Sequence, residues 1–213
     1  MNPKIKIITH RGFWMDKSEQ NTLLSFHRSF VNGYGIETDL RDFNGGLVIS
    51  HDIANNASIL LDDFLKMYKT FGLGLTIAFN IKSDGLASLL LKKLNDYNLN
   101  NYFVFDMSIP DTISYLDKEL VVFTRQSEYE IQPMFYNQIK GIWLDAFEKN
   151  WYSKELIVNH IMQNKLVAIV SPELHKRPYI EFWNWFKENE LHLLENILLC
   201  TDYPEEAKLF FYD

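Results

Sequence analysis

The chain has 213 residues, of which 47% are hydrophobic and 15% aromatic, so it is long enough to bury one large core. The net charge is −7 and no lysine- and arginine-rich run occurs, which argues against a nucleic-acid-binding surface. No apolar run approaches the roughly 20 residues of a membrane-spanning helix, and the N-terminus lacks a signal-peptide pattern. We therefore expect a soluble, cytoplasmic protein without a transmembrane segment.

Short apolar runs alternate along the chain with longer segments of helical periodicity. The predicted strands cover residues 4–9, 35–39, 75–82, 102–107, 120–124, 141–144, 165–170 and 196–200. Predicted helices between them include NTLLSFHRSFVN, LLDDFLKMYKTF, GLASLLLKKLNDY and YIEFWNWFKENE. This alternation predicts βα units and a parallel sheet, and eight units in a chain of this length favour a (β/α)8 barrel over an open sheet. We predict a single TIM-barrel domain over residues 1–213, with Cys200 as a buried apolar residue in the last strand.

The C-terminal ends of the predicted strands are polar. In a (β/α)8 barrel the catalytic groups lie at these ends, so the ends form a set of candidate functional residues. In chain order they are His10 and Arg11, Glu37 and Asp39, Asn80 and Lys82, Asp106 and Ser108, Thr124 and Arg125, Asp145, Ser171 and Glu173, and Thr201 and Asp202.

The second and third strands predict a cation site. In IETDL, strand alternation places Glu37 and Asp39 on one face, and burying two carboxylates is costly without a compensating cation or strong donors. Asn80 on the next strand can supply a third oxygen, and Lys82 a positive charge for a phosphate. Oxygen ligands favour a hard ion, Mg²⁺ or Ca²⁺, over zinc. The structural alternative is that the two carboxylates merely pair with Arg11 and Lys82.

A hairpin is predicted in RDFNGGLVISHD, where Asn44, Gly45 and Gly46 form a tight turn between two extended arms. The hairpin returns His51 toward the end of the second strand, near His10. Two histidines beside a phosphate can serve as general acid and general base at neutral pH. We expect surface or packing roles for the remaining histidines in helical segments, which are His27, His160 and His192.

Further candidates follow the seventh strand. Glu173 precedes a basic run, His175 to Arg177, where barrel enzymes often bind phosphate, so a substrate contact is one interpretation and a solvated loop the other. Trp14 and Trp143 lie near strand ends, where each either walls a pocket or packs in the core. Trp185 lies off the apolar stripe of its helix, which suggests an exposed side chain and a possible homodimer contact.

The ordered motifs HRG, EQNT, SF, GIETDL, GGLVISHD, FNIK and LLCTDYP resemble those of the glycerophosphodiester phosphodiesterase family, within the superfamily of phosphatidylinositol phospholipase C-like phosphodiesterases. The resemblance runs nearly end to end. It implies metal-dependent hydrolysis of a small-molecule phosphodiester, with His10 and His51 as the acid/base pair and Glu37 and Asp39 as metal ligands. It also implies phosphate contacts from Arg11 and Lys82. The nucleophile is water or a neighbouring substrate hydroxyl, the latter giving a cyclic phosphate.

The sequence departs from the family pattern at three places. Gln20 replaces the usual carboxylate after the first histidine, unless Glu19 takes its place, and Asn80 replaces a glutamate that usually binds the metal. The insertion that follows the histidine-aspartate pair in the family is reduced here to a short segment after Asp52. Two alternatives therefore stay open: a weakly active or inactive barrel that binds a phosphate-containing ligand, and another metal-dependent barrel enzyme such as an aldolase or isomerase.

Overall fold

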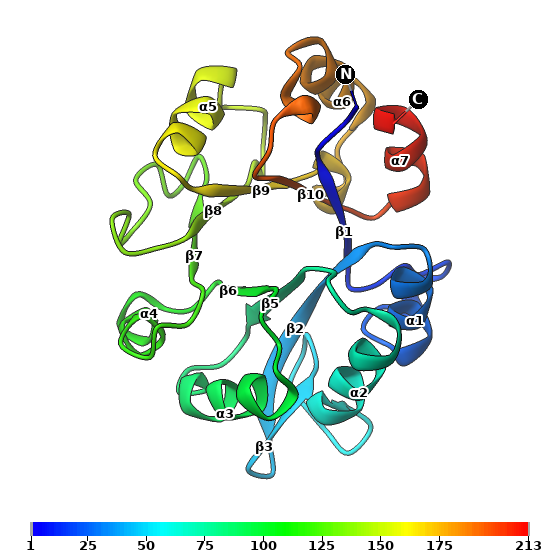
Figure 1. The fold of residues 1–213 in the computed structure, drawn as a ribbon, viewed down its shortest axis with the longest axis vertical. Coiled ribbons are helices and arrows are strands. Elements are labelled where there is room, and N and C mark those ends of the chain that lie inside the picture. Colours follow the sequence, from blue (N-terminus) through cyan, green and yellow to red (C-terminus); the bar gives the residue numbers. More distant parts are fainter. Residues whose placement is uncertain (1, 213) are drawn as a thin grey trace. The chain divides into compact units, whose positions relative to one another are not determined.

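The computed structural model describes residues 2–212 (Figure 1). Its contacts group into two compact units, which we describe separately. One unit runs from Thr9 to Val122, and the other combines the residues up to Ile8 with those from Phe123 onward. The boundary falls within the first strand, β1 (Lys6–His10). The prediction of a single domain stays a prediction.

The unit from Thr9 to Val122 has a mixed sheet whose parallel strands are β2, β5 and β6. An antiparallel arm is added where β2 pairs with β3 and β3 with β4. Its elements after β1 are η1 (Lys17–Glu19), α1 (Leu23–Val31), β2 (Gly35–Phe43), β3 (Gly46–Ile49), β4 (Ile59–Leu60), α2 (Leu61–Phe71), β5 (Ile77–Ile81), α3 (Ala87–Tyr97), β6 (Tyr102–Phe105) and α4 (Ile109–Leu116).

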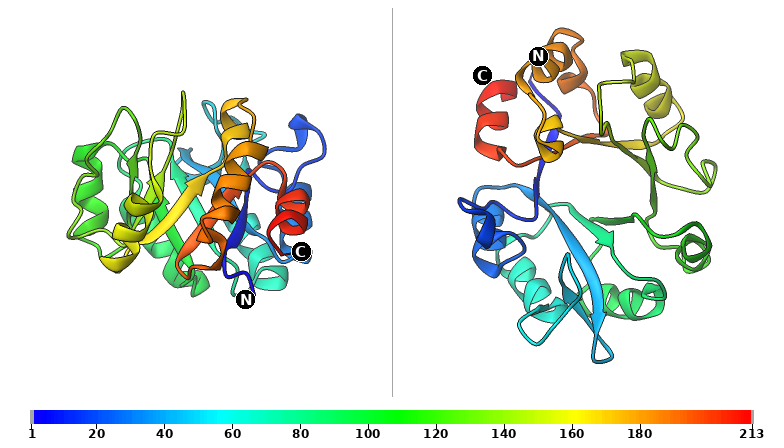
Figure 2. Two further views of the ribbon diagram at one scale, coloured as in Figure 1. Left: turned by 90° about the horizontal axis from the view of Figure 1, so that it is seen from above. Right: turned by 180° about the vertical axis from the view of Figure 1, so that it is seen from behind.

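The other unit has an entirely parallel arrangement, in the order β10-β9-β8-β7. Figure 2 shows these strands with their helices from two further sides. The elements are β7 (Phe123–Gln126), β8 (Gly141–Leu144), α5 (Lys154–Met162), β9 (Leu166–Val170), η2 (Pro172–His175), α6 (Ile180–Glu188), η3 (Leu191–Leu193), β10 (Ile197–Thr201) and α7 (Pro204–Tyr212).

The eight predicted strands correspond to β1, β2 and β5 to β10. The bounds of β8 are the predicted ones, β7 begins and ends later than predicted, and β2 continues to Phe43 because its last residues pair with β3 in the predicted hairpin. Asn44 and Gly45 form the turn with positive φ angles of 49° and 77°. Both residue types tolerate this left-handed backbone, so the turn follows from the sequence.

Helices pack onto the sheet through aromatic side chains. Between α1 and α2, the rings of Phe26 and Phe64 lie 4.9 Å apart edge to face, and Phe64 also contacts Phe79 of β5. All three side chains are fully buried. Strand β5 is therefore packed against buried aromatic side chains of the helices. Within residues 2–212, no helix combines the length and apolar character that crossing a bilayer needs.

Candidate functional site

The HRG motif forms a tight turn directly after β1. Arg11 has a φ of 57° and Gly12 a φ of 87°, so two consecutive residues adopt the left-handed backbone. A Cβ atom on Gly12 would lie 2.8 Å from Ser25 Cβ, which leaves room only for glycine. The Arg11 backbone N–H donates to Glu37 O at 2.9 Å. The turn therefore fixes Arg11 beside the end of β2.

The acidic pair of β2 is buried, as strand alternation predicts. Glu37 is 2% exposed and Asp39 is fully buried. Asp39 Oδ2 lies 3.0 Å from Arg11 Nε, and Asp39 Oδ1 lies 3.3 Å from Lys82 Nζ. Asn21 Nδ2 donates a further hydrogen bond of 2.8 Å to Asp39 Oδ2. Two cations and one amide thus compensate the Asp39 charge, which is the pairing that the structural alternative anticipates.

Glu37 has weaker compensation. Its Oε2 accepts a hydrogen bond from the Arg11 backbone N–H at 3.2 Å. Burial, reinforced by the nearby Asp39 charge, raises the pKa of Glu37 to about 7, while His10, Arg11 and Lys82 act in the opposite direction. Glu37 is therefore the less compensated member of the acidic pair.

Two oxygens on paired strands lack hydrogen bonds. Asp39 and Asn80 are register partners on β2 and β5, and the Oδ1 atom of each is buried without a hydrogen-bond partner. Such atoms are rare in folded proteins, because their desolvation is left uncompensated. Carboxylate and amide oxygens are ligands of hard cations, so Glu37, Asp39 and Asn80 suit Mg²⁺ or Ca²⁺. Within residues 2–212, no three His, Cys, Asp or Glu side chains gather in a metal-binding arrangement, and the third oxygen of this set comes from an amide, Asn80.

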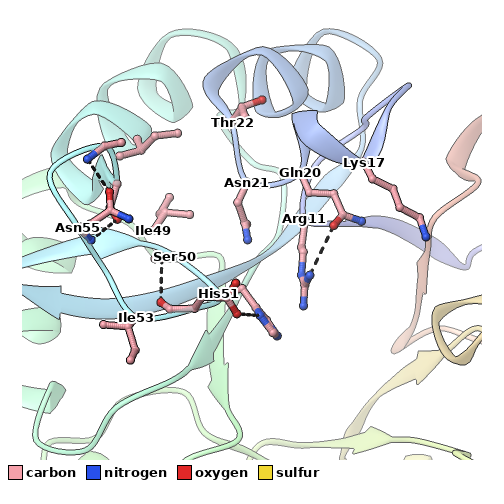
Figure 3. Close-up of a pocket in the computed structure, with 14 residues that line it drawn as sticks. Arg11, Lys17, Gln20, Asn21, Thr22, Ile49, Ser50, His51, Ile53 and Asn55 are labelled. Atoms are coloured by element: carbon pink, nitrogen blue, oxygen red, sulfur yellow. Dashed lines mark hydrogen bonds and ion pairs between the residues drawn. The ribbon is translucent and has the colours of Figure 1, made fainter.

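A pocket of about 470 Å³ opens between the loop after β1 and the segment after β3. Figure 3 shows Arg11, Gln20 and Asn21 reaching into it from one loop and His51 from the other. Its lining residues are Arg11, Lys17, Gln20, Asn21, Thr22, Ile49, Ser50, His51, Asp52, Ile53, Asn55, Ala57, Ser58 and Ile59. Arg11 both pairs with Asp39 and lines the pocket, so it connects the acidic pair to a space that can hold a ligand.

The structure places the two predicted catalytic histidines in different surroundings. His51 lines the pocket with 46% of its side chain exposed, and its Nδ1 lies 2.9 Å from Asp52 Oδ1. The backbone carbonyl of His51 accepts hydrogen bonds from Arg41 Nε and Nη2, which hold the returning chain in place. His10 ends β1 near Glu37, and its carbonyl accepts a hydrogen bond from Trp14 Nε1 at 3.0 Å.

Glu19 and Gln20, the two residues at the place of the family's usual carboxylate, make different contacts. Glu19 binds Arg28, with Oε2 2.7 Å from Nη1, and also accepts the Met15 N–H, so it fixes the loop. Gln20 lines the pocket, and its Oε1 lies 3.5 Å from Arg11 Nη1. The side chain beside Arg11 is therefore the neutral Gln20.

Asn21 is a contributor that the sequence analysis did not single out. Its amide donates to Asp39, its Oδ1 accepts from Thr38 Oγ1 at 2.8 Å, and its own N–H donates to Arg11 O. The residue has a φ of 56°, and Thr22 then caps α1. An asparagine directly before a helix-capping threonine is the signal that could have indicated a left-handed turn.

Glu173 lies in the other unit, at the start of η2. It is 8% exposed and accepts hydrogen bonds from Ser171 Oγ at 2.5 Å and from Thr201 Oγ1. Burial raises its pKa, against these hydrogen bonds.

Two of the other histidines and two of the tryptophans pack against neighbouring side chains. His160 bonds Gln126 Oε1 and Tyr136 OH at 2.8 Å each, and His27 contacts the Phe71 ring edge to face. Trp143 is buried within β8. Trp185, expected to be exposed, is half-buried against Tyr152, Phe182 and Phe186. Cys200 is buried, as predicted.

No family model and no curated protein matches the sequence. Solved structures match over nearly the whole chain. The glycerophosphodiester phosphodiesterase of Agrobacterium tumefaciens has a TM-score of 0.70 at 13% identity, covering 97% of this chain and 98% of its own. An Oleispira antarctica phosphodiesterase in complex with the product sn-glycerol-3-phosphate has a TM-score of 0.63 at 13% identity, with 98% and 97% covered. A Ca²⁺-dependent phosphatidylinositol-specific phospholipase C from Streptomyces antibioticus has 0.56 at 9% identity, with 98% and 96% covered.

These likenesses show the fold. The chain has the α/β fold of the TIM-barrel glycerophosphodiester phosphodiesterases, with a short antiparallel hairpin after the second strand. At low identity, these structural matches confirm the resemblance to glycerophosphodiester phosphodiesterases that the sequence motifs indicate. The fold is also similar to that of a phosphatidylinositol-specific phospholipase C.

Proposed function

We propose that the protein hydrolyses a small phosphodiester with the help of a divalent cation, using His10 and His51 as the acid/base pair. The observation that supports this most strongly is the pair of buried oxygens on Asp39 and Asn80 that accept no hydrogen bond, next to the buried Glu37. Buried oxygens without a hydrogen-bond partner are uncommon in folded proteins, and two of them face each other here on neighbouring strands. A hard cation would satisfy both atoms.

Glu37, Asp39 and Asn80 would hold Mg²⁺ or Ca²⁺, which when bound neutralises charge on a phosphate oxygen. Arg11 and Lys82 are the cations nearest this set, and Arg11 also lines the pocket. In the proposal, their guanidinium and ammonium groups bind the remaining phosphate oxygens and so stabilise developing negative charge.

The histidines would move the protons. Asp52 bonds His51 Nδ1, which fixes the ring and leaves Nε2 as the atom for proton transfer. One histidine would remove a proton from the attacking water or substrate hydroxyl, and the other would donate one to the departing alcohol oxygen. A glycerophosphodiester is the first substrate class to test, because one structural relative binds the product sn-glycerol-3-phosphate.

A second candidate function is phosphate-ligand binding without turnover. It is favoured by the neutral Asn80 and Gln20 at positions where the family has carboxylates, and by the ion pairs that Asp39 already forms with Arg11 and Lys82. Fewer negative charges weaken the hold on a divalent cation.

The test is incubation of the protein with glycerophosphocholine, glycerophosphoethanolamine or bis(p-nitrophenyl) phosphate in the presence of Mg²⁺, Ca²⁺ or Mn²⁺. Phosphorus NMR then identifies a monophosphate or a cyclic phosphate product. We expect turnover that EDTA abolishes and His51→Ala greatly reduces. Binding of sn-glycerol-3-phosphate without turnover of any diester would instead favour the second function.

A further inference from the structure

A cluster of charged side chains forms at the ends of β7, β8 and β9, within one unit. Arg125 comes from β7, Asp145 directly follows β8, and His175 ends η2 after β9. Asp145 is buried, with one oxygen bonded to Arg125 Nη1 and the other 2.6 Å from His175 Nε2. The Ala146 N–H also donates to Asp145 Oδ1, at 2.8 Å. One buried carboxylate thus orients both a guanidinium and an imidazole.

Both oriented groups remain partly in contact with solvent. The Arg125 and His175 side chains are 19% and 23% exposed, whereas the Asp145 side chain is 3% exposed. The Phe147 ring adds a second restraint, because Arg125 Cζ lies 5.2 Å from its centroid and the His175 ring lies 4.6 Å from it. The cost of fixing both side chains is therefore already met before any ligand arrives.

A second arginine lies near the cluster. Arg177 donates to Ala146 O at 2.6 Å and to Asn150 Oδ1, which keeps a second guanidinium beside the loop after β8. A further acidic group is Glu130, 56% exposed with an oxygen 3.8 Å from Arg125 Nε. So long and exposed an ion pair is weak, and an incoming anion can replace it.

Other acidic groups nearby are engaged elsewhere. Glu128 accepts the backbone N–H groups of Phe147 and Glu148, and Glu173 is bonded within its own network with Ser171 and Thr201. Neither carboxylate bonds Arg125 or His175 in these contacts. The basic residues here thus differ in role: Arg177 holds the loop, while Arg125 and His175 present N–H donors that one carboxylate positions.

We propose that Arg125 and His175, positioned by Asp145, form a binding site for an oxyanion, a phosphate or a carboxylate group of a small molecule. The site is formed within one unit and does not depend on the proposed phosphodiesterase activity. A planar guanidinium suits the paired oxygens of both anions, and an imidazole N–H adds a further hydrogen bond.

The experiment is nitrogen-detected histidine NMR on the whole protein, titrated separately with inorganic phosphate and with acetate at constant pH and ionic strength. His175→Gln assigns the His175 signals among the six histidines. We expect those signals to move saturably with at least one of the anions. Loss of the guanidinium fork in Arg125→Lys should weaken that binding by about tenfold. The matched control is Lys149→Gln, an exposed cation of the same segment, which should leave the affinity unchanged.

The two arms identify the ligand class, since saturation by phosphate alone or by acetate alone names the anion the site prefers. His175 signals that stay fixed with both anions would overturn the proposal, as would movement of the His10 and His51 signals only. An unchanged affinity in Arg125→Lys would overturn it too. If Arg125→Lys fails to fold, calorimetric titration of His175→Gln with phosphate and acetate replaces it, and undiminished binding of both again counts against the site.

Discussion

Asp39 and Asn80 lie opposite one another on β2 and β5, each with a buried Oδ1 atom that accepts no hydrogen bond. Lys82 Nζ approaches Asp39 Oδ1 to 3.3 Å, yet it leaves the neighbouring Asn80 oxygen unsatisfied. Both positions belong to the proposed cation site. A change at Asn80 should therefore alter the affinity for the cation that Asp39 would bind.

The first prediction concerns Asn80→Glu, which adds a carboxylate to this pair. A third negative oxygen donor increases the attraction for a hard cation, so calorimetric titration with Mg²⁺ and Ca²⁺ should show tighter binding than in the unaltered protein. Asn56→Glu adds the same charge on an exposed loop residue and should leave the affinity nearly unchanged. Weaker binding by Asn80→Glu would remove Asn80 from the ligand set.

The second prediction concerns pH and Glu37. Because its pKa is raised from 4.5 to about 7 in the folded state, the folded protein holds a proton that the unfolded chain releases between these values. In EDTA, the free energy of unfolding should thus fall as pH rises from about 4.5 to 7. Glu37→Gln removes this loss and should be more stable than the unaltered protein at pH 8, by roughly 1–3 kcal/mol.

Urea unfolding at pH 4.5 and pH 8, each in EDTA, measures that difference. The variant and the unaltered protein should differ less at the lower pH, where Glu37 is protonated in both states. A divalent cation added at pH 8 should stabilise only the protein that retains Glu37. An equal stability difference at both pH values would contradict the prediction.

The third prediction concerns the HRG turn. Gly12 and Gly33 both have positive φ angles, of 87° and 79°, but only Gly12 has neighbours where a Cβ atom would lie. Gly33→Ala should therefore cost about 1–2 kcal/mol for backbone strain alone. Gly12→Ala should cost roughly 1–3 kcal/mol more, because its methyl group overlaps Ser25. Denaturant unfolding of both variants measures the difference, and equal costs would mean that the turn shifts freely.

The strands and the hairpin could be predicted because they depend on local pattern. The apolar run before His10, the alternation in IETDL and the NGG turn each determine backbone shape within a few residues, and β1, β2 and β3 follow them. Alternation also put Glu37 and Asp39 on one buried face. These are properties of residue spacing and need no knowledge of distant partners.

Partner choice could not be predicted in the same way. Glu19 and Gln20 are adjacent, yet only the first binds Arg28, because Glu19 ends the turn η1 while Gln20 leaves it with an extended ψ of 137°. Asn21 itself bonds Asp39, which lies 18 positions away in the chain. Glu173 accepts hydrogen bonds from Ser171 and Thr201, which its position after a strand does not indicate, and its substrate contact stays a prediction. Such contacts depend on tertiary placement, which residue periodicity does not encode.

The last prediction is that His10 and His51 act as a unit. His10 is delivered by the end of β1, and His51 by the chain that returns from β3, where Asp52 holds its ring. One positioned acid or base contributes about 10² to 10⁴-fold in rate, so His10→Ala and His51→Ala should each lower kcat/KM by an amount in that range.

Groups that serve one reaction are not additive, so the double variant should be little slower than the slower single variant. Cation affinity and thermal stability should stay nearly constant, because neither histidine belongs to the proposed ligand set. His27→Ala, which alters a histidine packed against Phe71, is the control and should retain activity. The measurement is kcat/KM on whichever phosphodiester proves to be a substrate. If either single variant at His10 or His51 turns over at a near-normal rate, that histidine has a structural role and the two-histidine mechanism is wrong.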